Sequence, residues 1–116
     1  MRYHLWIIKI HKKMQKPQID FLNRLIEIIK EKKDQDPNKS YTAKLFAKGL
    51  PLITQKIGEE ATEIVVAALA QNREDLIGEV SDLIYHLLIL LEAKEIDISE
   101  VIAELQKRDH TQLDKI

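Results

Sequence analysis

The sequence predicts an all-α fold, and its composition is the first observation that supports this class. Only three glycines and three prolines occur in 116 residues, and the chain is rich in Leu, Ile, Ala, Glu and Lys, which favour helices over strands. The length and the 45% hydrophobic content fit one domain with a modest core. The second observation is a pair of long apolar segments joined by a short polar one, which predicts an antiparallel helical hairpin.

The first predicted helix covers residues 17–33. Proline is accepted at the first helical position, and apolar residues then recur at spacings of 3, 4 and 3 on one face, namely Ile19, Leu22, Ile26 and Ile29. A polar loop over residues 34–39 leads to Ser40, which suits an N-cap. The sequence therefore predicts a short second helix over residues 41–48, which ends at Gly49.

The hairpin is predicted from residues 51–71 and 73–94. Pro51 suits the start of its first helix, and Asn72 suits the N-cap of the second, with acidic residues following in the first turn. Because the connection is so short, the two helices should be antiparallel neighbours.

The second hairpin helix is apolar nearly all round over residues 83–91, so it should be buried on several sides. A single hairpin cannot bury this helix on several sides. We therefore expect two copies to pair into a four-helix bundle across a homodimer, or to form a higher homo-oligomer.

The last predicted helix follows Asp97–Glu100, a segment that resembles a capping box, and carries apolar residues at helical spacing, namely Ile98, Val101, Ile102 and Leu105. We expect residues 17–110 to form the all-α domain and residues 111–116 to form a C-terminal tail. Residues 1–16 form an N-terminal extension, for which a helix, a strand-like arm and a patch covering a partner all stay open.

The charge and residue usage exclude several classes of function. A net charge of −1 and a pI near 6.4 give no global basic field for binding nucleic acid. The absence of cysteine excludes disulfides and thiolate chemistry. The apolar run before Lys9 is shorter than a signal peptide needs, and no run is long enough to span a membrane. We expect a cytoplasmic protein without nucleic-acid or membrane partners.

Two pairs of acids lie in the most apolar part of the chain, Glu60-x-x-Glu63 and Glu79-x-x-Asp82, separated by 15 residues. Unpaired carboxylates are rarely buried. Helical periodicity puts each pair on one face, and the hairpin brings the two pairs to nearly the same level. Carboxylates gathered in this way suit Mg²⁺. The alternative is a solvated helix face with salt bridges to Lys56, and periodicity alone leaves both interpretations open.

The order of these motifs resembles the MazG-like all-α nucleotide pyrophosphohydrolases. Three longer segments are similar to the phosphoribosyl-ATP pyrophosphohydrolases of histidine biosynthesis: SYTAKLFAKG at 40–49, QKIGEEA at 55–61 and EVSDLIYHLL at 79–88. The resemblance extends from about residue 21 to residue 108. It implies a dimeric helical enzyme that uses Mg²⁺ to hydrolyse phosphoribosyl-ATP, a small nucleotide, to phosphoribosyl-AMP and pyrophosphate.

The resemblance also implies roles for individual residues. The expected metal ligands are Glu60, Glu63, Glu79 and Asp82. Glu59 and Glu60 are the expected catalytic residues, with Glu59 assisting as a ligand or a water-orienting base. The expected substrate contacts come from cations and hydroxyls, namely Tyr41, Thr42, Lys44, Lys48, Lys56 and Arg73.

Several alternatives stay open at this point. One is a house-cleaning pyrophosphatase of the same fold that acts on (d)NTPs, and another is a non-catalytic helical dimerisation module. The number of metal ions, the phosphorus that is attacked and the acid that acts as base are also open. His86 and Tyr85 interrupt the apolar run, and a histidine in such a place is more often a hydrogen-bonded interior residue than a ligand.

Overall fold

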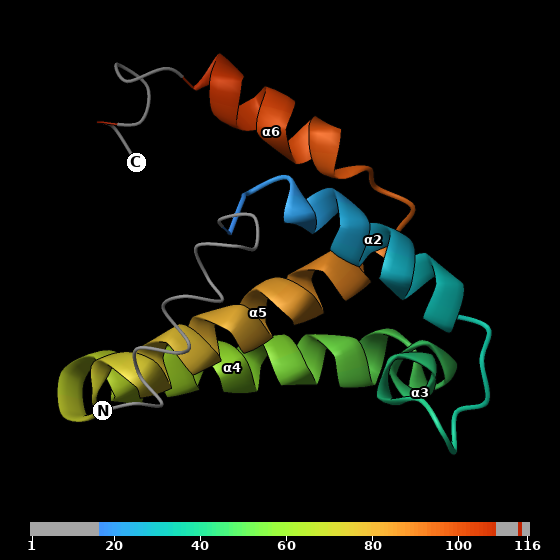
Figure 1. Ribbon diagram of the computed structural model, residues 1–116, viewed down its shortest axis with the longest axis horizontal. Helices are drawn as coiled ribbons and strands as arrows, with labels where there is room; N and C mark the ends of the chain where they lie inside the picture. Colours follow the sequence, from blue (N-terminus) through green and yellow to red (C-terminus); the bar gives the residue numbers. More distant parts are fainter. Residues whose placement is uncertain (1–16, 109–113, 115–116) are drawn as a thin grey trace, which may run out of the picture.

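The computed structural model describes residues 17–108 and Asp114, and these residues form five α-helices and no strand. Figure 1 shows how they are arranged, and their bounds are α2 Phe21–Lys32, α3 Tyr41–Lys48, α4 Leu50–Ala70, α5 Arg73–Ala93 and α6 Ile98–Lys107. The all-α class and the helical hairpin are confirmed. The predicted N-terminal extension, residues 1–16, and most of the predicted C-terminal tail lie outside the described residues.

The prediction that the first helix begins at Pro17 is wrong, because α2 begins at Phe21. The preceding residues form tight turns, in which Phe21 N–H donates to the Gln18 carbonyl at 3.1 Å and Leu22 N–H to the Ile19 carbonyl at 3.0 Å. Ile19 is 87% exposed, so it adds no apolar contact that would extend the helix. Without such packing, the residues between Pro17 and Phe21 do not continue the helix.

Side-chain caps fix the starts of three helices, as the sequence predicts. The Ser40 hydroxyl accepts from Ala43 N–H at 3.1 Å at the start of α3, and the Asn72 side chain accepts from Asp75 N–H at 2.9 Å at the start of α5. Asp97 and Glu100 form the predicted capping box of α6.

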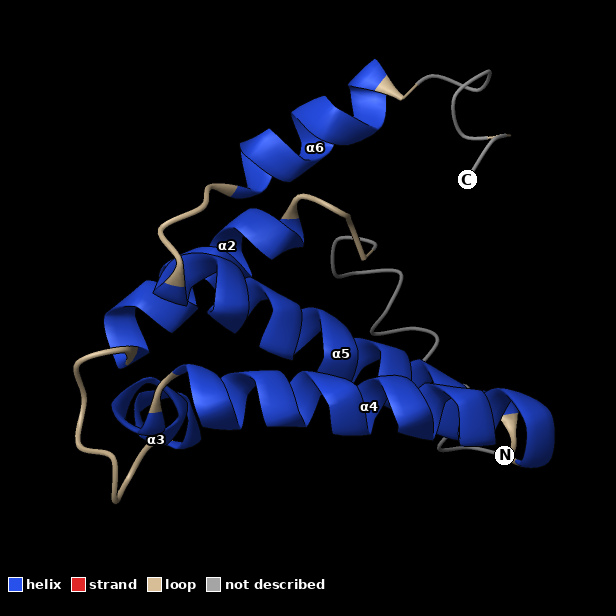
Figure 2. Ribbon diagram, turned by 180° about the vertical axis from the view of Figure 1, so that it is seen from behind, coloured by secondary structure: helices blue, strands red, loops and turns tan. Residues whose placement is uncertain are grey.

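A sharp corner at Gly49 separates α3 from α4. Its φ of 80° lies in the left-handed region that glycine favours, and its N–H donates to the Leu45 carbonyl at 2.9 Å. Because the chain turns at one residue, α3 lies across the end of the hairpin and is seen nearly end-on in Figures 1 and 2. Leu50, one residue before the predicted start, is the first residue of α4.

The hydrophobic core lies at the end of the hairpin that α2 and α3 cover. Its buried side chains come from α2, α3, α4 and α5, namely Ile29, Leu45, Ile53, Leu88 and Ile89. Outside this core, the hairpin leaves large apolar side chains exposed, including Val65, Leu69, Ile77, Val80, Ile84 and Leu87. Within the part of the chain that the structure describes, no helix is long and apolar enough to cross a membrane.

Candidate active site

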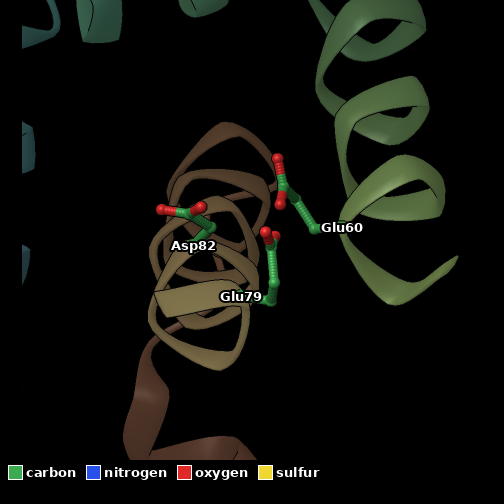
Figure 3. Close-up of side chains that lie close together, drawn as sticks. All are labelled: Glu60, Glu79 and Asp82. Carbon is green, nitrogen blue, oxygen red and sulfur yellow. The ribbon is translucent and has the colours of Figure 1, made fainter. Parts of the chain in front are cut away.

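Three acids converge between the two hairpin helices. Glu60 comes from α4, and Glu79 and Asp82 come from α5. Each offers a carboxylate oxygen, and these oxygens all lie within 4.8 Å of one another (Figure 3). Glu60 is only 6% exposed, whereas Asp82 opens to solvent. The antiparallel hairpin therefore brings the acids of the two helices to one level, as helical rise and periodicity predict.

The deeper acids lack the partners that buried carboxylates normally have. Within the described residues, Glu60 Oε2 and Glu79 Oε2 are buried and accept no hydrogen bond. Burial raises the pKa of Glu60 above its usual value, and the neighbouring carboxyl of Glu63 raises it further. The neighbouring carboxyl of Glu63, then burial and then the carboxyl of Glu60 raise the pKa of Glu79 to about 7. The cluster thus has excess negative charge and oxygen donors that suit a hard divalent cation.

The metal-free protein is expected to lose stability as the pH rises from about 4.5 to about 7. The unfolded chain releases the Glu79 proton near the ordinary pKa of 4.5, but the folded chain keeps it to about 7. The folded state therefore binds more protons in this window, so the free energy of unfolding falls as pH rises. Thermal melts in EDTA between about pH 5 and about pH 8 measure this slope.

Glu79→Gln is the matched control for the pH dependence, since the amide has no proton to release. Most of the slope should disappear in this variant, and a divalent cation that binds these carboxylates would raise the wild-type melting temperature at neutral pH, since a ligand of the folded state stabilises that state. An identical slope in wild type and variant would refute the assignment of the titration to this cluster.

The other two predicted acids, Glu63 and Glu59, are not part of this group of three. Glu63 is exposed, and its carboxyl lies close enough to Glu79 to raise the pKa of that group. Glu59 is held by Gln55 Nε2 at 2.9 Å and by Lys56 Nζ at 3.2 Å. These two contacts, the hydrogen bond from Gln55 first, lower the pKa of Glu59, so this carboxyl stays ionised at neutral pH.

The predicted substrate contacts are spread over three regions. Lys56 is partly buried beside Glu59, and Arg73 is exposed as the first residue of α5. Lys44 and Lys48 are exposed on α3 and line an open cleft together with Tyr41.

Thr42 differs from the other predicted contacts because it is buried. It is only 3% exposed, and its hydroxyl contacts the Tyr85 hydroxyl. This contact joins α3 to α5, so a direct contact between Thr42 and the substrate stays a prediction.

A hydrogen-bonded histidine joins α3 to the acid-bearing helix, and its contacts were not predicted. His86 is 5% exposed, its Nδ1 lies 2.6 Å from the Asp82 carbonyl oxygen, and its Nε2 lies 2.8 Å from the Tyr41 hydroxyl. Since a carbonyl only accepts, Nδ1 carries the proton and Nε2 accepts from Tyr41. The spacing of four residues from Asp82 was the available signal, but the partner on α3 depends on tertiary structure.

The fold and these acids define a class of protein, the all-α nucleotide pyrophosphohydrolases that carry acidic pairs on facing helices. Comparison with known sequences places the chain in one particular family of this class. The sequence model described as Phosphoribosyl-ATP pyrophosphohydrolase matches residues 22–109, which is most of the chain, and the chain belongs to this family.

Similar proteins agree with this assignment. The chain is 53% identical over 92 residues to a protein of Novosphingobium aromaticivorans named phosphoribosyl-ATP pyrophosphatase, covering 79% of this chain and 86% of the relative. A protein of the same name from Erythrobacter litoralis is 50% identical, with 76% and 85% covered. The histidine biosynthesis bifunctional protein HisIE of Shewanella oneidensis is 49% identical, but the match spans only 42% of that longer protein.

Proposed function

We propose that this protein hydrolyses phosphoribosyl-ATP to phosphoribosyl-AMP and pyrophosphate, an early step of histidine biosynthesis, in the cytoplasm. One observation carries the proposal: in a chain of this family, Glu60, Glu79 and Asp82 present oxygens within 4.8 Å of one another. The names of the relatives support the same substrate and pathway.

Mg²⁺ is the cofactor that these residues suit. We assign Glu60, Glu79 and Asp82 as its ligands, with Glu63 beside them, because Mg²⁺ prefers carboxylate oxygens and keeps sites for water and substrate phosphates. The two buried oxygens without partners are the structural support for this assignment. When bound, the ion supplies positive charge that neutralises phosphate oxygens and lowers the pKa of water.

Glu59 and Glu60 are the catalytic residues in this proposal. Glu60 is buried, so its carboxylate would act on the substrate by helping to hold the cation that neutralises the phosphate oxygens. Glu59 stays ionised, so its carboxylate can orient the attacking water and accept its proton. Lys56, 3.2 Å from Glu59, adds a cation next to the acids that can meet the phosphate charge. Arg73 is a further cation that we assign to substrate binding.

We also propose that two hairpins form a four-helix bundle across a homodimer. The supporting observation is an exposed apolar stripe on α5 at spacings of 3, 4 and 3, namely Ile77, Val80, Ile84 and Leu87. By helical periodicity this stripe lies on the opposite side of α5 from Glu79 and Asp82. Such spacing is typical of the seam between packed helices, and pairing through it would leave the acids accessible.

The substrate assignment is tested by measuring pyrophosphate release from phosphoribosyl-ATP, dATP and dUTP at equal concentrations with Mg²⁺. We expect phosphoribosyl-ATP to have by far the highest kcat/KM, because a site built for an extra phosphoribosyl group leaves polar groups unpaired with simpler nucleotides. Equal or greater activity on the deoxynucleotides would instead indicate a house-cleaning enzyme, and no activity on any of the three would indicate a non-catalytic module.

A further inference from the structure

An open cleft lies between the loop that precedes α3 and the exposed face of α3. Its volume is about 570 Å³, which is within the usual size of small-molecule sites. The residues of the cleft that offer polar groups are Asn38, Lys39, Ser40, Tyr41, Lys44 and Lys48. Sequence patterns did not indicate Lys39, because it lies in an irregular loop.

The cleft carries positive charge that the described residues leave uncompensated. Within residues 17–108, Lys39, Lys44 and Lys48 form no ion pair, whereas Lys33 and Lys56 pair with carboxylates at 3.5 and 3.2 Å. No acidic residue lines the cleft in this part of the chain, and the first turn of α3 contains no acid. The positive end of the α3 dipole adds to the same field. Three free ammonium groups around one opening suit a phosphate.

Tyr41 connects this cleft to the acid cluster. Its ring lines the cleft, and its hydroxyl lies 2.8 Å from His86 Nε2. His86 in turn lies 2.6 Å from the carbonyl oxygen of Asp82, one of the clustered acids. The Tyr41–His86 hydrogen bond therefore fixes a residue of the cleft against α5, the helix that carries Glu79 and Asp82.

We propose that the cleft formed by Lys39, Lys44, Lys48 and Tyr41 is a second phosphate subsite, which holds a phosphate group of the substrate that the acid cluster does not hold. This inference rests on the proposed function. Phosphoribosyl-ATP carries both a triphosphate and a separate ribosyl phosphate, so a molecule bound at the acids still has a terminal phosphate to place. Either the ribosyl phosphate or the end of the triphosphate fits the chemistry of the cleft.

The kinetic test uses Lys39→Gln and Lys44→Gln, with Lys32→Gln as a control on an exposed lysine of α2 outside the cleft. We expect each cleft variant to raise KM for phosphoribosyl-ATP about 10-fold or more, since a charge-assisted hydrogen bond is lost, while kcat changes little. The control should keep the wild-type KM. If the cleft variants change KM no more than Lys32→Gln does, the subsite is refuted.

The inhibition constant of ATP, which lacks the phosphoribosyl group, identifies the phosphate that is bound. An unchanged constant in the cleft variants assigns the ribosyl phosphate to the subsite, and a parallel rise assigns the end of the triphosphate.

A binding measurement separates this inference from the proposed enzymatic function. Ribose 5-phosphate and pyrophosphate, added to metal-free protein in EDTA, should shift the backbone amide signals of residues 38–48 in NMR spectra, and Lys39→Gln should weaken the shifts. This result does not require turnover. If neither compound shifts these signals while phosphoribosyl-ATP is still hydrolysed, the subsite is wrong and the enzymatic function stands.

Discussion

Glu79→Gln is expected to lower kcat for phosphoribosyl-ATP by at least about 10²–10³-fold at saturating Mg²⁺. The substitution keeps the shape of the side chain but removes one negative charge from the cluster of Glu60, Glu79 and Asp82. Charge stabilisation by a bound metal is worth several kcal/mol in such reactions, and each 1.36 kcal/mol changes the rate about tenfold. Asp82→Asn should cause a loss of the same order.

Glu79→Gln should lower activity but raise the stability of the metal-free protein. Glu60 and Glu79 carry buried oxygens without partners in the described residues, so removing one charge relieves repulsion in the metal-free state. We expect Glu79→Gln to melt at a higher temperature than wild type in EDTA at neutral pH and to gain less from added Mg²⁺. Glu74→Gln, on an exposed acid in the first turn of α5, is the control and should keep wild-type activity. Wild-type turnover by Glu79→Gln would mean that the carboxylate is structural.

Ile84→Glu is expected to raise the dissociation constant of the proposed dimer by at least about 100-fold. Ile84 is 38% exposed and lies within the apolar stripe of α5. An unpaired carboxylate taken into an apolar interface costs several kcal/mol, and each 1.4 kcal/mol is a factor of ten in the dissociation constant. A two-fold symmetric interface contains the substitution twice, which increases the effect.

Sedimentation velocity over a range of protein concentrations measures this change, with circular dichroism as a check that the helices remain. Ile102→Glu is the matched control, since Ile102 is also an exposed isoleucine, 46% accessible, but lies on α6. The control should sediment as the wild type does. A monomeric wild type, or a variant that dimerises as tightly as wild type, would contradict the four-helix bundle.

Local signals were sufficient to predict most of the helices. Ser40, Asn72 and Asp97 cap the helices that they were expected to cap, because a cap depends on residues within three positions along the chain. The start of α2 was mispredicted because Pro17 permits a helix but cannot supply the packing that sustains one. Exposed Ile19 shows that this packing is missing.

Some features of the candidate site could likewise be predicted from the sequence, and others could not. The convergence of Glu60 with Glu79 and Asp82 follows from helical rise and a short turn, so it could be predicted from spacing. The contact between Tyr41 and His86 could not be predicted, because it depends on how Gly49 turns α3 across the hairpin. For the same reason, Lys39 becomes a candidate only when the loop and α3 are seen to line one cleft.

The most direct test of metal-dependent hydrolysis at the facing acids of α4 and α5 is pyrophosphate release from phosphoribosyl-ATP. The rate is measured while Mg²⁺ is titrated into EDTA-treated protein, with wild type and Glu79→Gln side by side. We expect wild-type turnover to appear only as Mg²⁺ is added, and the variant to stay at least about 10²-fold slower at every concentration. Turnover that persists in EDTA, or that is equal in the two proteins, would contradict a metal site formed by these carboxylates.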